Sequence, residues 1–149
     1  MIILSVDPGT VRIGVAISDA SGTIATPLEI FTHKSREVDA RRIASMAAAR
    51  GAERIIIGQS LDEDGQPTES GRSAARLAAA VREASGLPVE LVEESFTTAD
   101  VLEARLESGM KRKKRRAPPD AEAAALLLQN YLDSNRVIRA PSTAKGRNP

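Results

Sequence analysis

Apolar and polar residues alternate in a way that predicts a β-hairpin at the start of the chain. Residues 2–6 are almost entirely apolar, Asp7 follows them, and a Pro-Gly turn leads into residues 13–18, where branched apolar residues alternate with small ones. A run that is apolar on both faces is typical of a buried central strand. We therefore expect Asp7 at the edge of a packed sheet. Turn chemistry, in which the Asp side chain binds nearby backbone N–H groups, is an equally good interpretation of this stretch alone.

The same periodicity predicts three further strands and four helices along the rest of the chain. Pro27 makes the third strand an edge strand, because proline cannot donate a hydrogen bond to a central ladder. The order of elements indicates an α/β fold, with a five-stranded mixed sheet flanked by helices. Its first three strands are antiparallel and its last two are parallel. The further strands are expected at 23–31, 54–58 and 89–94. Helices are expected at 35–50, at 97–109 and from Pro118-Pro119 onward, and a second helix is expected around the stripe Ala74, Leu77, Ala78 and Val81, with Gly86 after its end.

Length and composition limit the class of protein. A chain of 149 residues corresponds to one domain. We expect a folded domain over residues 1–133 and a disordered basic tail over 134–149, where no apolar period continues. The absence of cysteine excludes disulfides and thiolate metal sites. No leader pattern and no apolar run near the ~18 residues of a membrane span are present, so we expect a soluble, cytoplasmic protein.

Charge is distributed unevenly along the chain. The net charge is only +1, but residues 1–109 hold 11 Lys or Arg against 17 Asp or Glu, while residues 110–149 hold 10 against 3. A polyanion would therefore be attracted to one segment rather than to the whole surface. The centre of that segment is a run of six cations: Lys111, Arg112, Lys113, Lys114, Arg115 and Arg116. A solvated loop is the alternative interpretation of such a run.

Three acidic positions could meet at one edge of the sheet: Asp7, one of the pair Glu93 and Glu94, and Asp120. The two glutamates end the fifth strand, and Asp120 precedes the apolar stripe of the last helix. Periodicity does not decide which glutamate faces Asp7, and an acid in a first helical turn can simply complement the helix dipole. If three carboxylates converge, their repulsion requires a cation or a proton. Oxygen ligands of this kind suit Mg²⁺ or Mn²⁺, and metals held by carboxylates suit phosphodiester hydrolysis.

With these residues laid out, the chain resembles the YqgF/RuvX family, whose members are labelled "putative Holliday junction resolvase" or "putative pre-16S rRNA nuclease". The resemblance covers about residues 1–133 and rests on four ordered blocks, each weak alone and specific together. The blocks are Asp7-Pro-Gly-Thr-Val-Arg-Ile-Gly-Val-Ala, Ile57-Gly58 with the loop through Gly65, Glu93-Glu-Ser-Phe-Thr-Thr98, and the basic run leading to Asp120-Ala-Glu-Ala-Ala-Ala-Leu-Leu-Leu-Gln129.

The resemblance implies an RNase H-like fold and a catalytic, metal-binding set of Asp7, Glu94 and Asp120. It also implies a role in trimming the 5′ end of the 16S rRNA precursor or, in the older proposal, in cutting four-way DNA junctions. This chain departs from the family at Glu93 and Ser95, where an aspartate and an arginine are common, and at Gln59-Ser60, where Leu-Pro is usual.

The leading hypothesis is a metal-dependent nuclease acting on RNA, with Thr10, Arg12 and the six cations as phosphate contacts. With one Tyr, two Phe and no Trp, stacking on bases cannot be the main source of RNA-binding affinity.

A junction resolvase would need a homodimer, whereas the nuclease could be a monomer. A non-catalytic RNA-binding factor is a further alternative, and the Asp-x-Gly-Thr opening also resembles the phosphate loop of actin-like and sugar kinases, which need two such domains. His33, the only histidine, is interpreted as a surface residue.

Overall fold

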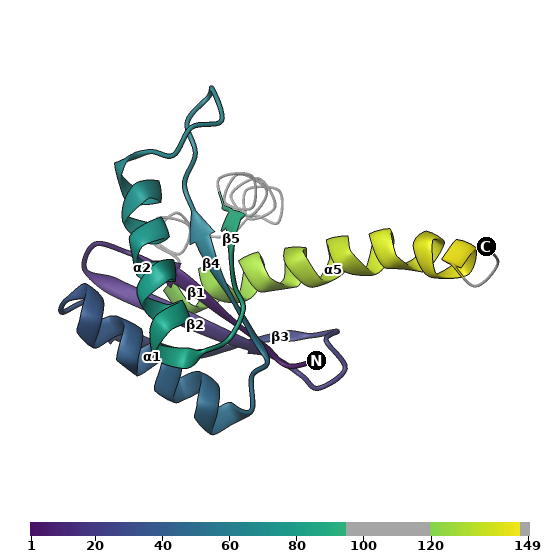
Figure 1. Cartoon of the computed structure of the whole chain (residues 1–149), viewed down its shortest axis with the longest axis horizontal. Helices are drawn as coiled ribbons and strands as arrows, with labels where there is room; N and C mark the ends of the chain where they lie inside the picture. Colours follow the sequence, from purple (N-terminus) through teal and green to yellow (C-terminus); the bar gives the residue numbers. More distant parts are fainter. Residues whose placement is uncertain (95–119, 147–149) are drawn as a thin grey trace, which may run out of the picture.

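The computed structural model describes the backbone of residues 1–94 and 120–146 and the side chains of residues 1–94 and 121–135. The helix expected at 97–109 and the basic run at 111–116 lie outside the described residues. The described chain forms one sheet with helices on both faces (Figure 1). The strands are β1 (Ile3–Pro8), β2 (Arg12–Ser18), β3 (Ala25–Thr32), β4 (Arg54–Gln59) and β5 (Val89–Glu93), and the described helices are α1 (Arg36–Arg50), α2 (Glu69–Ser85) and α5 (Asp120–Gly146).

The sheet has the mixed topology that the sequence predicts. Its strand order is β3-β2-β1-β4-β5, with β1 antiparallel to β2 and parallel to β4. β2 and β3 are antiparallel, and β4 and β5 are parallel. The expectation that Pro27 marks an edge strand is confirmed, because β3 is the outer strand of the sheet that the described residues form. The strands β1, β4 and β5 therefore all end at the same edge.

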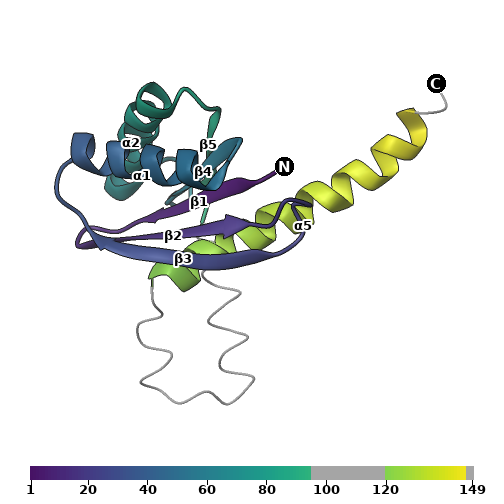
Figure 2. The same cartoon turned by 90° about the horizontal axis from the view of Figure 1, so that it is seen from below.

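Alternate residues of the central strands face two separate cores. Leu4 and Val6 of β1 are fully buried with side chains of α1 and α2, whereas Ile3 is buried with side chains of α5. Figure 2 shows this layering, with α1 and α2 above the sheet and α5 below it. Because side chains alternate along a strand, Asp7 lies on the α5 face together with Ile3 and Ser5.

Helix α1 begins and ends where the sequence predicts, and α2 ends before Gly86 as expected. Ser35 caps α1, where its hydroxyl accepts a hydrogen bond from the Val38 N–H at 3.2 Å. Gly51 ends the helix with a φ of 71°, a left-handed conformation that favours glycine. The α2 stripe of Ala74, Leu77, Ala78 and Val81 is buried, as its spacing predicts.

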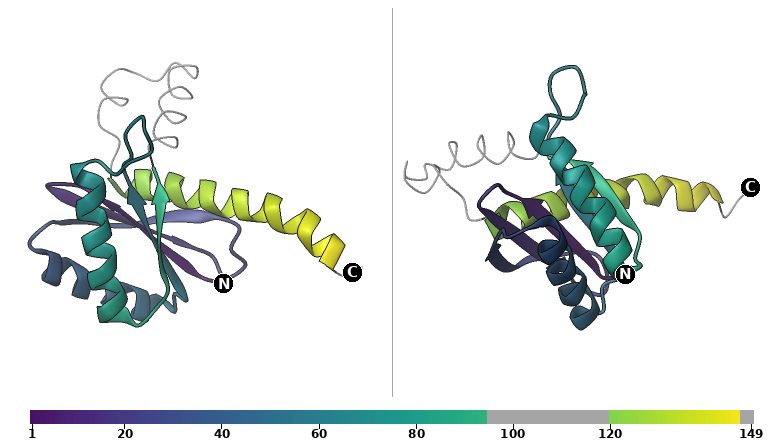
Figure 3. Two further views of the ribbon diagram at one scale, coloured as in Figure 1. Left: turned by 45° about the horizontal axis from the view of Figure 1, so that its top comes forward. Right: turned by 60° about the vertical axis from the view of Figure 1, so that its left-hand side comes forward.

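Helix α5 crosses the sheet and continues past it. Ala124, Leu127 and Leu128 are buried against the sheet as expected, and the Ser5 hydroxyl donates to the Ala124 carbonyl at 2.9 Å. The backbone of α5 stays helical past Asp133 as far as Gly146 and projects beyond the sheet (Figure 3), although no apolar stripe continues there. No helix in the described ranges is both long enough and apolar enough to cross a bilayer.

Candidate active site at the carboxyl edge of the sheet

Asp7 and Glu94 meet at the edge where β1 and β5 end. Asp7 is the last residue but one of β1, and Glu94 directly follows β5. The Glu94 N–H donates to the Gln59 carbonyl at 3.1 Å, which extends the pairing of β4 and β5 by one residue. Val92 packs in the α5 core, so Glu94, two residues later, shares the face on which Asp7 lies.

The two carboxyl groups are close enough to share a proton. Burial, the negative charge of Asp7 and a hydrogen bond to Asp7 together raise the pKa of Glu94 to about 8. The protonated Glu94 side chain therefore donates to the Asp7 carboxylate at neutral pH. Such a pair loses its proton when a cation arrives to neutralise the two charges, and this is the behaviour expected of metal ligands.

Gly58 provides the space into which the Glu94 side chain fits. A Cβ atom built on Gly58 would lie 2.5 Å from Glu94 Oε1 and 3.2 Å from the Leu127 Cδ2 atom of α5. Any other residue at this position would push against both the acid and the helix. The sequence carried a signal for this role, since a glycine inside a buried strand often marks a close approach, but the role itself was not predicted.

Glu93 lies apart from this pair. It is exposed, and strand alternation directs it to the face opposite Glu94. Periodicity alone left the two glutamates as alternatives, the family resemblance implied Glu94, and the structure brings Glu94 rather than Glu93 to Asp7.

The backbone of Asp120 begins α5 at the same edge. The hydrogen bond between Ser5 and Ala124 places that part of α5 against the middle of β1. Further along α5, the Gln129 side chain accepts from the Ala25 N–H at 3.0 Å, at the opposite edge of the sheet. The helix therefore runs from the Asp7 edge toward the start of β1. Asp120 precedes Ala124 by about one turn, ~6 Å, and Asp7 follows Ser5 by ~7 Å in the same direction.

Among the side chains that the structure describes, no three of the His, Cys, Asp and Glu type lie close enough together to hold a metal ion. Asp7 and Glu94 form a pair, and a third ligand would have to come from Asp120 or from another residue whose side chain is not described. Thr10 and Arg12 are exposed and lie at the hairpin beside Asp7. The six cations expected to bind phosphate lie outside the described residues.

Comparisons with known proteins agree with this arrangement. The family model described as "RuvX: Holliday junction resolvase" matches residues 1–134. A protein of Leifsonia xyli subsp. xyli named "Putative pre-16S rRNA nuclease" is 39% identical over 138 residues, which cover 93% of this chain and 89% of the relative. A protein of Syntrophus aciditrophicus with the same name is 38% identical over 144 residues, 97% of this chain and 96% of the relative.

The fold is also found among solved structures. The structure of T. thermophilus RuvC in complex with a Holliday junction substrate superimposes with a TM-score of 0.56 at 18% identity, over 91% of this chain and 96% of that one. A likeness at this identity establishes the fold, which is RNase H-like as predicted. Because the family model spans the sheet, both described carboxylates and the start of α5, we conclude that the chain belongs to the RuvX (YqgF) family.

Proposed function

We propose that the protein is a divalent-metal-dependent nuclease that hydrolyses RNA phosphodiester bonds and trims the 5′ end of the 16S rRNA precursor. The observation that carries the proposal is the pair of Asp7 and Glu94, two carboxyl groups that share a proton at the edge of a packed sheet. A buried acid pair of this kind costs folding free energy, and such pairs concentrate at functional sites. The names of the relatives support RNA as the substrate.

The residues at this edge fit a hard divalent cation. Asp7, Glu94 and Asp120 would hold Mg²⁺ or Mn²⁺ with carboxylate oxygens, which are the ligands these ions prefer. When bound, the metal activates water and stabilises the charge on the leaving oxygen. Glu94 gives up its proton as the ion binds, and Gly58 and Leu127 keep its side chain beside Asp7.

RNA binding is expected to depend on the sugar-phosphate backbone. Aromatic residues make up only 2% of the chain, so stacking on bases contributes little. The run from Lys111 to Arg116 would supply the phosphate contacts, with Thr10 and Arg12 at the hairpin.

The test compares cleavage of end-labelled 16S precursor RNA and of a four-way DNA junction, with Mg²⁺ or Mn²⁺ and with EDTA. We expect RNA cleavage that requires the metal and falls at least about 100-fold in Asp7→Asn and Glu94→Gln, because even residues that only support metal ligands contribute 10–100-fold. Glu93→Gln is the matched control, since it makes the same chemical change one residue away on the opposite face.

Each other outcome has a definite meaning. Paired symmetric cuts in the DNA junction would replace the RNA nuclease by a resolvase that acts as a homodimer. RNA binding without cleavage by the wild-type protein would favour a non-catalytic RNA-binding factor. Equal loss of activity in Glu93→Gln and Glu94→Gln would contradict the assignment of Glu94 as the ligand.

A further inference from the structure

A second hollow lies at the same edge of the sheet but on the opposite face. It has a volume of about 270 Å³ and opens between the β1–β2 turn and the first turns of α1 and α2. Apolar side chains such as Leu77 form its floor. Polar side chains line the rest: Thr10 from the turn, His33 from the segment between β3 and α1, Arg36 from the start of α1, and Ser70 and Ser73 from α2. A volume near 300 Å³ is at the lower end of the range for pockets that bind small ligands.

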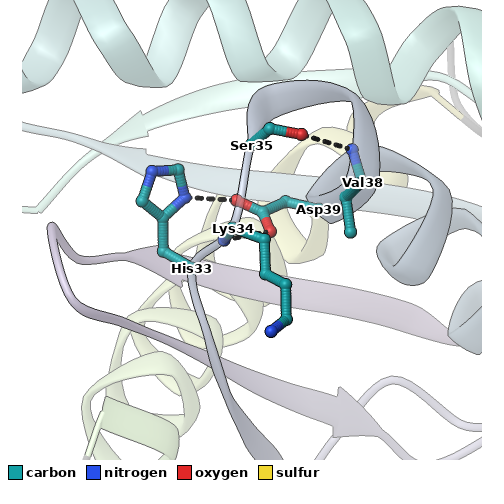
Figure 4. Close-up of polar contacts among 5 residues, drawn as sticks. All are labelled: His33, Lys34, Ser35, Val38 and Asp39. Carbon is teal, nitrogen blue, oxygen red and sulfur yellow. Dashed lines mark hydrogen bonds and ion pairs between the residues drawn. The ribbon is translucent and has the colours of Figure 1, made fainter.

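A buried carboxylate fixes the histidine of this hollow. His33 Nδ1 lies 2.5 Å from Asp39 Oδ2, and the Lys34 N–H donates to Asp39 Oδ1 at 3.1 Å (Figure 4). Asp39 is only 2% exposed, whereas the His33 side chain is 42% exposed. Because an ionised carboxylate only accepts hydrogen bonds, Nδ1 carries the proton, and Nε2 of the neutral ring is an acceptor that can bind a hydroxyl of a ligand but cannot donate to an oxyanion.

The remaining polar side chains around the hollow can donate hydrogen bonds to a ligand. Within the described part of the chain, the Arg36 guanidinium makes no hydrogen bond or ion pair, and neither do the hydroxyls of Thr10, Ser70 and Ser73. The one carboxylate lining the hollow, Asp39, is already bound by its two neighbours. The charges of Arg36 and Asp39 therefore balance, and the Arg36 guanidinium is the charged group that remains to meet an anion.

Such a set of groups suits a tetrahedral oxyanion. A guanidinium binds phosphate with two parallel hydrogen bonds, and the hydroxyls from the β1–β2 turn and from α2 can donate to the remaining oxygens. We propose that this hollow is a phosphate-binding site, separate from the carboxylate pair, which takes a phosphate of the RNA strand or of a free nucleotide. The RNA source rests on the proposed function, because Thr10 is only three residues from Asp7 and one strand could reach both faces of the edge.

The test measures binding in EDTA, where cleavage does not occur. The Kd of a fluorescein-labelled RNA 12-mer is measured by anisotropy, and that of AMP by calorimetry, for the wild type, Arg36→Gln and Arg41→Gln. Arg41 is exposed on the same helix and does not line the hollow, so its variant makes the same change in net charge. We expect Arg36→Gln to weaken RNA binding about 10-fold and Arg41→Gln to change it less than 2-fold, since a charge-assisted hydrogen bond is at stake.

A second variant checks the site without removing the arginine. Ser73→Asp adds a carboxylate at the rim of the hollow and should weaken binding by a similar factor. If only Arg36→Gln and Ser73→Asp lose RNA binding, the hollow binds a phosphate of the RNA strand. If these two variants lose AMP binding but keep RNA binding, the hollow binds the phosphate of a free nucleotide. Equal Kd values for Arg36→Gln and Arg41→Gln, with both ligands, would overturn the site. Failure of metal-dependent cleavage would remove the proposed nuclease and leave this binding result intact.

Discussion

Glu94 keeps its proton at neutral pH because its surroundings oppose ionisation. Burial removes water from the carboxyl group, and the negative charge and hydrogen bond of Asp7 add to that effect, so its pKa rises to about 8. The ordinary value of a glutamate is 4.5, and the unfolded chain has that value. The proton therefore stabilises the folded state, and this contribution is complete below about pH 4.5 and is lost as the pH rises through about 8.

We predict that the metal-free wild type loses stability between pH 5 and pH 9 and that Glu94→Gln loses less. The difference should amount to a few kcal/mol, because one pKa unit corresponds to 1.36 kcal/mol. The measurement is the free energy of unfolding by urea in EDTA at pH 5, 7 and 9. Identical pH profiles for the two proteins would mean that Glu94 titrates normally. Glu93→Gln again serves as the control and should follow the wild type.

Gly58 is the second residue whose role depends on a single contact. In Gly58→Ala, the new methyl carbon would lie only 2.5 Å from Glu94 Oε1, so the Glu94 side chain would have to move. We predict that metal-dependent cleavage falls at least about 10-fold, as for residues that support metal ligands, while stability falls by about 1–3 kcal/mol, the usual cost of overpacking.

The control for Gly58→Ala has to separate activity from stability. Ile56→Val lies on the same strand, in the α5 core, and should cost about 0.5–1.5 kcal/mol without touching the acids. Its cleavage rate should remain near that of the wild type. A Gly58→Ala protein that melts earlier but cleaves at full rate would show that Glu94 can move without consequence.

At the scale of elements, one buried hydroxyl links the central strand to α5. Ser5 is fully buried, and its hydroxyl donates to the Ala124 carbonyl at 2.9 Å. This bond helps to hold the start of α5, with Asp120, against the edge where Asp7 lies. We predict that Ser5→Ala lowers the free energy of unfolding by about 1 kcal/mol, measured by urea denaturation. Ser45→Ala, at an exposed position of α1, should not lower the free energy of unfolding, and an equal loss in both variants would contradict the link.

Most elements could be predicted because local signals agreed with the final fold. Ser35 and Gly51 bound α1 by caps that the sequence displays, and Pro27 marks the outer strand. Periodicity alone could not choose between Glu93 and Glu94, because β5 carries apolar residues on both faces and a period of two does not identify the α5 side. The family resemblance, rather than the pattern, pointed to Glu94. The length of α5 could not be predicted either, because no apolar stripe continues beyond Asp133, whereas the backbone is helical to Gly146.

For the whole molecule, the charges are arranged so that the acidic site and the basic run are neighbours along the chain. Residues 1–109 carry an excess of acid, and residues 110–149 carry 10 Lys or Arg against 3 Asp or Glu. Arg116 precedes Asp120 by four residues, and four residues span at most ~14 Å in any conformation. Since α5 begins at the Asp7 edge, the basic run stays within reach of a strand bound there, whatever its own conformation.

This arrangement predicts a steep dependence of RNA binding on salt. If all six cations from Lys111 to Arg116 contact phosphates of single-stranded RNA, log K should fall against log[salt] with a slope near −4, about 0.7 per charge. The measurement is anisotropy in EDTA between 50 and 300 mM KCl, with a variant in which the six residues are glutamine. That variant should lose most of the slope. A wild-type slope shallower than about −1 would reject the basic run as the RNA contact and leave the hairpin and the phosphate hollow as the remaining candidates.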